Sequence, residues 1–397
     1  MDEFIDAERL AQQFTLDELN EAADEYFRSV DDPSYLFAKP LGNVLEAPTM
    51  LMHFAAMLYG LWVEPKDTVL DFGAGACWTS RMMAQLGCDV IACDVSPTAL
   101  RLGEELCRLQ PAPGRGQVRF LVFDGRRLDL PDASVDRIAC MDAFHHVPSW
   151  PEVLAEFHRV LKPGGRVVMA EPGPEHSRTA AAQQEMSMYT VLERNVIIED
   201  VAALAAKAGF TSTAIGMYSG HPVFVPVEQF DEELASGRAI TEGMRAFMVN
   251  HRLIALTKGW DGLHTSRDGT GLQGKVEIEW KGGLSYRARI TNTGEATWLP
   301  EDVEFGTVRL GIQVFDERGV LMKRDHQRVP LRYNRTCPTR PGESVEVDFD
   351  VVPPPGKQFR LGFDLVSEHV CWLSDVVDGR CQVTGVLPMQ GSIDEGT

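Results

Sequence analysis

The segment Val69-Leu-Asp-Phe-Gly-Ala-Gly-Ala-Cys-Trp78 decides the fold of this chain. Its apolar start predicts a short buried strand that ends at Asp71, and Gly73 and Gly75 follow, separated by one residue. Glycines permit a sharp turn and let a ligand lie against the main chain. The run 79–86 then predicts a helix whose first N–H groups point into that turn. The pattern indicates a nucleotide-type cofactor at the carboxyl end of the first strand of an open α/β sheet.

Length and charge limit the possible classes of protein. At 397 residues the chain is long for one core, so two domains are expected. The net charge of -20 argues against a nucleic-acid partner, because phosphate binding requires a basic surface. The acidic N-terminus shows no secretion signal, and the most apolar run, 47–63, is too short to span a bilayer comfortably. We predict a cytoplasmic protein with no membrane span.

Cysteine spacing gives no sign of a metal or redox centre. None of the eight cysteines forms a Cys-x-x-Cys pair, so a zinc ribbon or redox dithiol is not expected. Scattered thiols in apolar segments are typical of reduced core residues in a cytosolic protein. No metal site is predicted.

The first two thirds of the chain predict alternating helices and strands. An N-terminal helical cap is expected over 1–63, with a capping box at Thr15 and Glu18, and a sheet domain over 64–259. A second capping box, Ser149 with Glu152, predicts a helix that 162–165 closes. The expected strands cover 68–70, 89–93, 117–123, 135–141, 166–170, 211–218 and 251–257, and the expected helices include 15–29, 48–60 and 198–208. An insertion at 219–248 is expected to line a substrate site.

The rest of the chain has a different pattern. Residues 260–274, rich in Gly, Asp, Ser and Thr, predict a linker. An all-β, antiparallel sandwich is expected over 275–388, because short segments alternate between apolar and polar residues. The predicted strands are 275–281, 284–291, 308–315, 344–351 and 359–366.

Four acids mark the ends of four successive predicted strands: Asp71, Asp94, Asp124 and Asp142. In an open parallel sheet these ends share one edge, where ligands bind. Asp94 could accept both hydroxyls of a ribose, and Asp124 could accept an adenine amino group. Val95 and Gly125, which follow these two acids, belong to the same predicted cofactor site.

A nicotinamide dinucleotide fold shares the glycines and the acid after the second strand. Three features count against it. An acid precedes the glycines, Trp78 stands where the third glycine of the dinucleotide motif belongs, and the domain ends in a strand pair instead of a second mononucleotide half.

Residues 64–258 resemble the class I S-adenosylmethionine-dependent methyltransferases, and they are most similar to the small-molecule group that includes the ubiquinone-biosynthesis C-methyltransferases. The resemblance implies a Rossmann-like sheet with helices on both faces and S-adenosylmethionine as the cofactor. Besides Val69–Gly75, the motifs that carry it are Asp94-Val-Ser-Pro97, Phe123-Asp-Gly125, Leu128-Asp-Leu-Pro-Asp-Ala-Ser-Val-Asp136, Phe144-His-His-Val-Pro148 and Glu156-Phe-His-Arg-Val-Leu-Lys-Pro-Gly-Gly165.

This resemblance also implies roles for individual residues. It implies Gly73 and Gly75 beside the methionine moiety, Asp94 on the ribose and Asp124 near the adenine. The chain departs from the family at Cys77, where many members carry a third glycine, and this affects the expected local shape of the site.

The β-rich tail resembles immunoglobulin-like modules of bacterial surface-polysaccharide biosynthesis proteins. The resemblance lies in Ile290-Thr-Asn-Thr-Gly-Glu-Ala-Thr-Trp-Leu299 and Pro341-Gly-Glu343. It implies a glycan or protein partner bound through the β-rich domain.

Candidate catalytic residues follow from the chemistry of methyl transfer. The reaction is an in-line displacement from a positively charged sulfur, so alignment supplies much of the catalysis. Nearby aromatic rings assist, and Trp78, Phe144 and Tyr26 are candidates. A hydroxyl nucleophile needs a base that works near neutral pH, which suits histidine. The candidate bases are His145, His146 and His176, which follow the fourth and fifth strands.

Three functions remain open from the sequence. The leading hypothesis is O-methylation of a sugar or glycan hydroxyl, with the β-rich domain as a binding module. The second is C- or O-methylation of an apolar small molecule, which the methionine-rich helix 48–60 favours. The third is a non-catalytic scaffold that binds a partner through the β-rich domain.

Overall fold

The computed structural model describes residues 4–112, 116–219, 222–354, 359–376 and 380–385. The chain divides into two compact units, residues 1–259 and 260–397. The predicted end of the β-rich domain at residue 388 lies outside the described residues.

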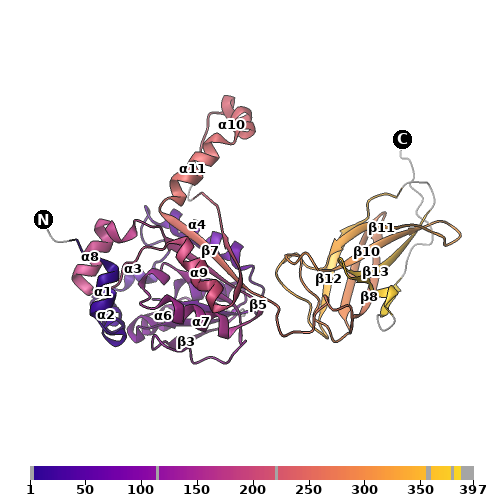
Figure 1. The fold of residues 1–397 in the computed structure, drawn as a ribbon. Helices are drawn as coiled ribbons and strands as arrows, with labels where there is room; N and C mark the ends of the chain where they lie inside the picture. The colour runs from indigo at the N-terminus through magenta and orange to yellow at the C-terminus, as the bar shows by residue number, and fades with distance from the viewer. Residues whose placement is uncertain (1–3, 113–115, 220–221, 355–358, 377–379, 386–397) are drawn as a thin grey trace. The chain divides into compact units, whose positions relative to one another are not determined.

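The centre of the N-terminal unit is a seven-stranded sheet with the order β3-β2-β1-β4-β5-β7-β6 (Figure 1). β1 to β5 run parallel, and β7 pairs antiparallel with both β5 and β6. This confirms the predicted open α/β sheet with a final strand pair. The strands are β1 (Thr68–Phe72), β2 (Asp89–Asp94), β3 (Val118–Val122), β4 (Val135–Met141), β5 (Leu161–Pro172), β6 (Phe210–Ile215) and β7 (His251–Lys258).

Helices cover both faces of this sheet, because neighbouring strand residues point to opposite sides. Val69 lies in the apolar core that includes α4 and α5, whereas Leu70 lies in the core that includes α7 and α9. The helices that cover the two faces are α4 (Ala47–Leu61), α5 (Trp78–Gln85), α6 (Pro97–Leu109), α7 (Trp150–Val160) and α9 (Ile198–Ala208). Among the helices of the described residues, none is long and apolar enough to cross a membrane.

The N-terminal segment forms α1 (Ala7–Gln13), α2 (Leu16–Arg28) and α3 (Ser34–Phe37). The predicted capping box of α2 is present: Thr15 accepts the N–H of Glu18, and the Glu18 carboxylate accepts the N–H of Thr15. α2 packs against α8 (Ala180–Tyr189), and the rings of Tyr26 and Tyr189 meet edge to face at 5.1 Å.

Two local predictions around α7 were wrong. Ser149 precedes the helix, but its side chain makes no capping hydrogen bond; Pro151 in the first turn presets the helical backbone instead. The segment 162–165 does not separate α7 from a later strand. β5 begins directly at Leu161, where Leu161 pairs with Val135.

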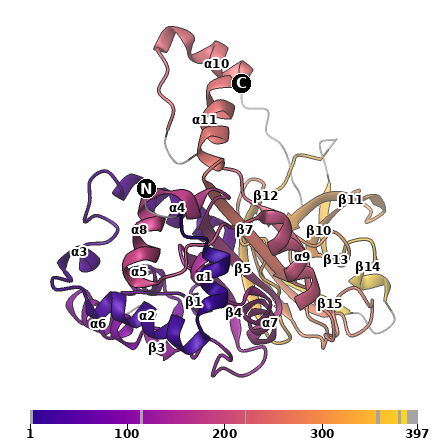
Figure 2. The same ribbon diagram turned by 60° about the vertical axis from the view of Figure 1, so that its left-hand side comes forward.

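The insertion between β6 and β7 forms η3 (Val227–Gln229), α10 (Phe230–Ser236) and α11 (Arg238–Met248). α10 and α11 project away from the sheet in both views (Figures 1 and 2). None of the residues in these three elements is buried.

The C-terminal unit contains two four-stranded sheets with the orders β11-β10-β13-β14 and β12-β9-β8-β15. Apolar residues of both sheets form one core around Trp298. The strands are β8 (Gln273–Gly282), β9 (Ser285–Asn292), β10 (Val308–Phe315), β11 (Leu321–Pro330), β12 (Ser344–Asp350), β13 (Arg360–Ser367), β14 (Cys371–Trp372) and β15 (Arg380–Gly385). All five predicted strands are present, and β11, β14 and β15 were not predicted.

The predicted linker 260–274 belongs to the fold of the C-terminal unit. Ser266 is fully buried and donates to the carbonyl of Gly306, and Leu272 lies in the core. The polar composition of this segment reflects hydrogen bonding inside the unit, so from Thr265 onward the segment is part of a folded domain and not a linker.

Candidate functional site

The carboxyl ends of the parallel strands open onto a cavity of about 410 Å³. Its floor comes from residues at the ends of β1, β2, β4 and β5, and its walls come from α2, α8 and the loop 190–197. Eight predicted site residues line it: Gly73, Asp94, Val95, Gly125, Asp142, His145, His146 and His176. Asp71, Gly75 and Asp124 are not among the lining residues.

The turn after β1 is tied to the end of β2. Gly73 and Gly75 have φ angles of +69° and +50°, which favour glycine. A Cβ atom on Gly73 would lie 2.2 Å from the Cβ of Ala143, so a side chain has no room there. The Asp94 carboxylate accepts the N–H of Gly75 at 2.8 Å and that of Ser96 at 2.9 Å. Each carboxylate oxygen retains a second lone pair for a ligand.

Asp71 has a structural environment. Its carboxylate is buried and accepts hydrogen bonds from the hydroxyls of Thr79 and Ser80, at 2.6 and 2.5 Å. Burial raises the pKa of Asp71 to about 6. The residue therefore fixes the first turn of α5 beneath the glycine turn, and a direct cofactor contact by Asp71 stays a prediction.

Asp124 lies at the edge of the site. Its exposed carboxylate accepts the N–H groups of Arg127 and Arg126, at 2.9 and 2.8 Å, and these bonds lower its pKa. Its carbonyl accepts a hydrogen bond from the Asn20 side chain at 3.0 Å. Asp124 thus shapes the turn that presents Gly125 to the cavity, and its adenine contact stays a prediction.

Asp142 lies at the end of β4 with its side chain open to the cavity. It has a φ angle of +50°, a backbone conformation that Asp tolerates better than bulkier residues. Its enclosure in the cavity, together with the nearby charge of Glu171, raises the pKa of Asp142 to about 6.

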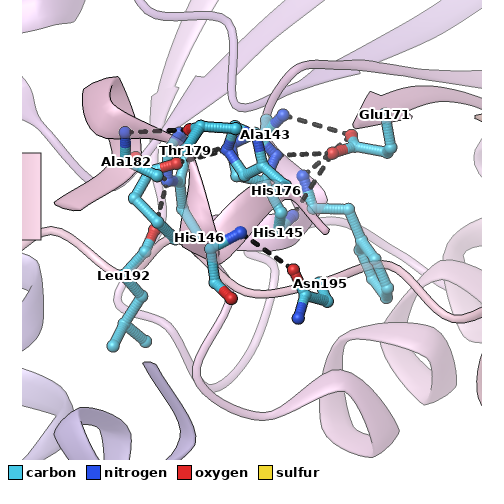
Figure 3. A network of polar contacts seen from close by, with 12 residues as sticks. Ala143, His145, His146, Glu171, His176, Thr179, Ala182, Leu192 and Asn195 are labelled. Atoms are coloured by element: carbon cyan, nitrogen blue, oxygen red, sulfur yellow. Dashed lines mark hydrogen bonds and ion pairs between the residues drawn. The ribbon is translucent and has the colours of Figure 1, made fainter. Parts of the chain in front are cut away.

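His145 is held by Glu171 at the end of β5. Its Nδ1 lies 2.7 Å from Oε2 of Glu171, and Figure 3 shows the two side chains facing each other. The Glu171 carboxylate also accepts the N–H groups of Ala143 and Phe144, at 3.1 and 2.9 Å. Burial lowers the pKa of His145 to about 4, so the ring is neutral at pH 7 and donates through Nδ1.

His146 has a different partner. Its Nδ1 lies 2.6 Å from the carbonyl oxygen of Leu192 (Figure 3). A carbonyl only accepts hydrogen bonds, so Nδ1 carries the proton and Nε2 carries the lone pair of the neutral ring. Burial lowers the pKa of His146, which keeps the ring neutral near pH 7.

Glu193 is the cavity residue that the sequence analysis missed. Its Oε2 lies 2.5 Å from Nε2 of His176 and 3.6 Å from Nε2 of His145, and its carboxylate is buried. Burial alone would raise the pKa of Glu193, but the hydrogen bond with His176 and the nearby histidines bring it below its usual range. Glu193 lies in the extended loop before α9, where no sequence periodicity marks it.

The carboxylates that line the cavity give it a negative charge. Besides Tyr26, the ionisable lining residues are four carboxylates and three histidines: Asp94, Asp142, Glu185, Glu193, His145, His146 and His176. Among the described lining residues, none is Lys or Arg. The cavity therefore favours a positively charged group over an anion.

The aromatic predictions were partly wrong. Trp78 and Phe144 are packed in the core, against Phe54 and Trp150 respectively, and neither lines the cavity. Tyr26 does line it. The aromatic lining residues are Tyr26, Phe27, Phe72 and Phe123.

The departure at Cys77 also lies outside the cavity. Cys77 has a φ angle of +62° and is fully buried next to α6. A Cβ on Gly103 would lie 2.2 Å from the Cys77 sulfur, so Gly103 makes room for this side chain.

Part of the chain that forms this site is similar to known proteins. Residues 70–169, which begin within β1 and end within β5, match the family model described as a methyltransferase domain. Sterol 24-C-methyltransferase of Eremothecium gossypii is 30% identical over 188 residues, which are 43% of this chain and 50% of that protein. Demethylmenaquinone methyltransferase of Streptomyces griseus is 32% identical over 108 residues, 27% of this chain and 44% of that protein.

A third curated relative and a solved structure are also similar to this chain. The 2-methyl-6-phytyl-1,4-hydroquinone methyltransferase of Synechocystis sp. is 34% identical over 131 residues, 32% of this chain and 40% of that protein. A solved structure of geranyl diphosphate methyltransferase with GPP and sinefungin is 17% identical, has a TM-score of 0.43 and covers 60% of this chain and 99% of its own.

Residues 70–169 of the N-terminal unit are thus similar to a methyltransferase domain. The chain spans half or less of the length of these curated relatives.

Proposed function

We propose that this protein is an S-adenosylmethionine-dependent methyltransferase that acts on a largely apolar small molecule. The observation that carries the proposal is the shared cavity, where Gly73 and Asp94 at the sheet edge lie in one space with His146. The similarity to methyltransferases named for a sterol, a menaquinone precursor and a phytyl hydroquinone supports the apolar acceptor.

The residues at the sheet edge suit this cofactor, which supplies an electrophilic methyl group on a positively charged sulfur. Asp94 would accept the ribose hydroxyls through the lone pairs that Gly75 and Ser96 leave available. The acidic cavity without described Lys or Arg favours the positive sulfur, and the Tyr26 ring offers it a cation–π contact.

His146 is the proposed general base. Its Nε2 carries a lone pair, because Nδ1 donates to the carbonyl of Leu192. As the acceptor's electron pair forms the new bond to the methyl carbon, the acceptor's proton passes to Nε2, and the electrons of the broken sulfur–carbon bond remain on sulfur. The other two predicted bases, His145 and His176, have ring nitrogens engaged by carboxylates.

Part of the cavity is walled mainly by apolar side chains. They come from α2 and from the loop before α9 and include Leu16, Leu19, Ala23, Phe27, Val191 and Leu192. Burying such walls against an apolar acceptor contributes roughly 25 cal/mol per Å² of apolar surface.

Methylation of a sugar or glycan hydroxyl is the second candidate. It is supported by the C-terminal unit, whose two four-stranded sheets form a separate domain suited to binding a second molecule. If the protein is a non-catalytic scaffold, no methyl group is transferred to either class of acceptor.

Binding and transfer assays with the full chain test these proposals. We expect S-adenosylhomocysteine to bind in calorimetry, and labelled methyl to pass from S-adenosylmethionine to a sterol or reduced quinone but not to oligosaccharides. His146→Phe should lower kcat by about 100-fold or more and leave cofactor affinity unchanged. The exposed His264→Phe is the matched control.

Absence of cofactor binding would overturn the methyltransferase proposal. Transfer to oligosaccharides alone would replace the apolar acceptor with the glycan. Full activity of His146→Phe would remove the proposed base.

A further inference from the structure

We propose that His145, His176 and Glu193 bind a divalent transition-metal ion of the zinc or iron type at the histidine end of the cavity. The binding itself does not depend on the proposed methyltransferase activity.

The candidate ligand atoms already lie close together. They are one ring nitrogen from each histidine and one carboxylate oxygen of Glu193, and all lie within 4.8 Å of one another. A metal ion with bonds of about 2.0–2.2 Å holds neighbouring ligand atoms about 3 Å apart. The two distances from Glu193 Oε2, 2.5 Å to His176 Nε2 and 3.6 Å to His145 Nε2, bracket that value. Small side-chain rotations therefore suffice to place an ion between the three.

An outer carboxylate orients the first ligand. Nδ1 of His145 donates to Glu171 at 2.7 Å, which assigns the Nε2 lone pair to the side of Glu193. Metal-binding histidines usually donate their other N–H to a carboxylate or carbonyl in this way. Glu171 is fixed in turn by the N–H groups of Ala143 and Phe144.

A bound cation would stabilise the contact between His145 and Glu193. With Nδ1 protonated and the ring neutral, Nε2 and Glu193 Oε2 are both acceptors, and they lie 3.6 Å apart. Two acceptors at this distance repel each other unless a cation or a proton lies nearby. The proton of His176 reaches the same carboxylate oxygen at 2.5 Å, and a bound metal ion would replace it.

The surroundings favour a cation and leave it accessible. All three proposed ligands line the cavity, together with Asp142 and Glu185 and without a described Lys or Arg. Molecules in the cavity can therefore fill the remaining coordination positions of the ion. Two imidazole nitrogens and one carboxylate oxygen suit Zn²⁺ or Fe²⁺, whereas Mg²⁺ and Ca²⁺ prefer oxygen ligands.

No metal site was predicted from the sequence. The three proposed ligands come from three separate segments, so no local pattern marks them. His145 lies in η1 (Phe144–His146) after β4, His176 in η2 (His176–Arg178) after β5, and Glu193 in the loop before α9. No short ligand spacing exists to be recognised.

A metal ion here would have a chemical use if the proposed function holds. It would bind an oxygen of the acceptor and lower the pKa of that group, so that His146 removes the proton more readily. This role rests on the proposed function.

Metal titration of the full chain tests the site. The protein is freed of metal with a chelator, and Zn²⁺, anaerobic Fe²⁺ and Mg²⁺ are added separately. We expect one tightly bound Zn²⁺ per chain and no Mg²⁺ at the same concentration. Glu193→Gln should weaken Zn²⁺ binding by about tenfold or more, while the exposed His264→Ala should not. Near-UV circular dichroism checks that the variants are folded.

X-ray absorption of the zinc-loaded wild-type protein decides the case even if the variants misfold. Nitrogen and oxygen ligands at about 2.0–2.1 Å with two imidazoles support the site, and sulfur ligands at about 2.3 Å overturn it. Absence of bound Zn²⁺, or equal affinity in Glu193→Gln, also overturns it. S-adenosylhomocysteine binding, measured in parallel, separates this failure from failure of the proposed function.

Discussion

The N–H of Gly75 donates a 2.8 Å hydrogen bond to the Asp94 carboxylate, and this bond joins the turn after β1 to the end of β2. Asp94 therefore acts on the site in two ways. It holds the glycine turn in its left-handed conformation, and it presents its remaining lone pairs to the cavity.

Replacing Asp94 should weaken cofactor binding. In Asp94→Asn, one carboxylate oxygen becomes an NH₂ group, which cannot accept the N–H of Gly75 or a ribose hydroxyl. Hydrogen bonds to charged groups contribute about 1.5–3 kcal/mol, so affinity for S-adenosylhomocysteine should fall about ten- to 100-fold in calorimetry. Asp89→Asn, at the exposed opposite end of β2, is the control. Unchanged affinity in Asp94→Asn would contradict the assigned ribose contact.

The buried Asp71 should make stability depend on pH. Its folded-state pKa of about 6 lies above the usual 3.8, so its contribution to stability is present at low pH and is lost as pH rises through 3.8 to 6. Asp71→Asn keeps an oxygen for the hydroxyls of Thr79 and Ser80 but carries no charge. Across this window, the free energy of unfolding of the variant should gain about 3 kcal/mol relative to wild type.

Urea unfolding at a series of pH values measures this difference, and Asp89→Asn controls for the loss of a carboxylate. A difference between Asp71→Asn and wild type that stays constant with pH would show that the pKa of Asp71 is the same in the folded and unfolded chains.

The hydrogen bonds that join α2 to the start of α6 should hold α2 in place as a wall of the cavity. Asp24 is buried and accepts the hydroxyl of Ser96 at 2.6 Å and the N–H of Thr98 at 2.9 Å. Asp24→Ala leaves both donors without this partner, which should cost about 1–3 kcal/mol of stability. Faster hydrogen exchange in α2 and weaker cofactor binding should accompany the loss, because α2 lines the cavity.

Glu25→Ala, at the exposed neighbouring position of α2, should change neither quantity. If Asp24→Ala lowers stability but leaves α2 exchange as in wild type, these hydrogen bonds do not hold this helix.

Glu171 should determine the order of the loop after β4. Its carboxylate accepts the N–H groups of Ala143 and Phe144 as well as Nδ1 of His145. Glu171→Gln places an NH₂ group against one set of these donors, and the free energy of unfolding should fall by at least about 2 kcal/mol. Chemical denaturation measures the loss, with Glu152→Gln on the exposed surface of α7 as control. Equal losses in the two variants would contradict the proposed role.

The sheet and its edge could be predicted because their signals are local. Buried parallel strands are apolar runs, and an acid or glycine ends each one, so the strands and the shared edge follow from short segments such as 69–75. The same local signal cannot tell which way an acid points. Asp94 faces the cavity, whereas Asp71, which pairs with Ala92 and so lies two residues earlier in the register, faces Thr79 and Ser80 in α5.

Features without a local period were missed. β11 is a sheet-edge strand whose sequence Leu-Met-Lys-Arg-Asp-His-Gln-Arg-Val-Pro lacks apolar alternation, because most of its side chains are not buried. Glu193 acquires its role only when the loop before α9 folds against His145 and His176. The insertion was expected to line a substrate site, yet no described residue of 222–248 lines the cavity, and that expectation stays without support.

The cavity wall formed by α2 has a consequence for how this protein could diversify. The cofactor end of the cavity is built by strand ends in the middle of the chain, whereas the apolar wall comes from a helix within its first 28 residues. Leu16 lies against Gly125 at the sheet edge, and Asp24 accepts a hydrogen bond from Ser96 just after β2. A change of this helix would therefore alter the space for an acceptor and the residues at the strand ends together, so acceptor range and cofactor affinity are expected to change in step.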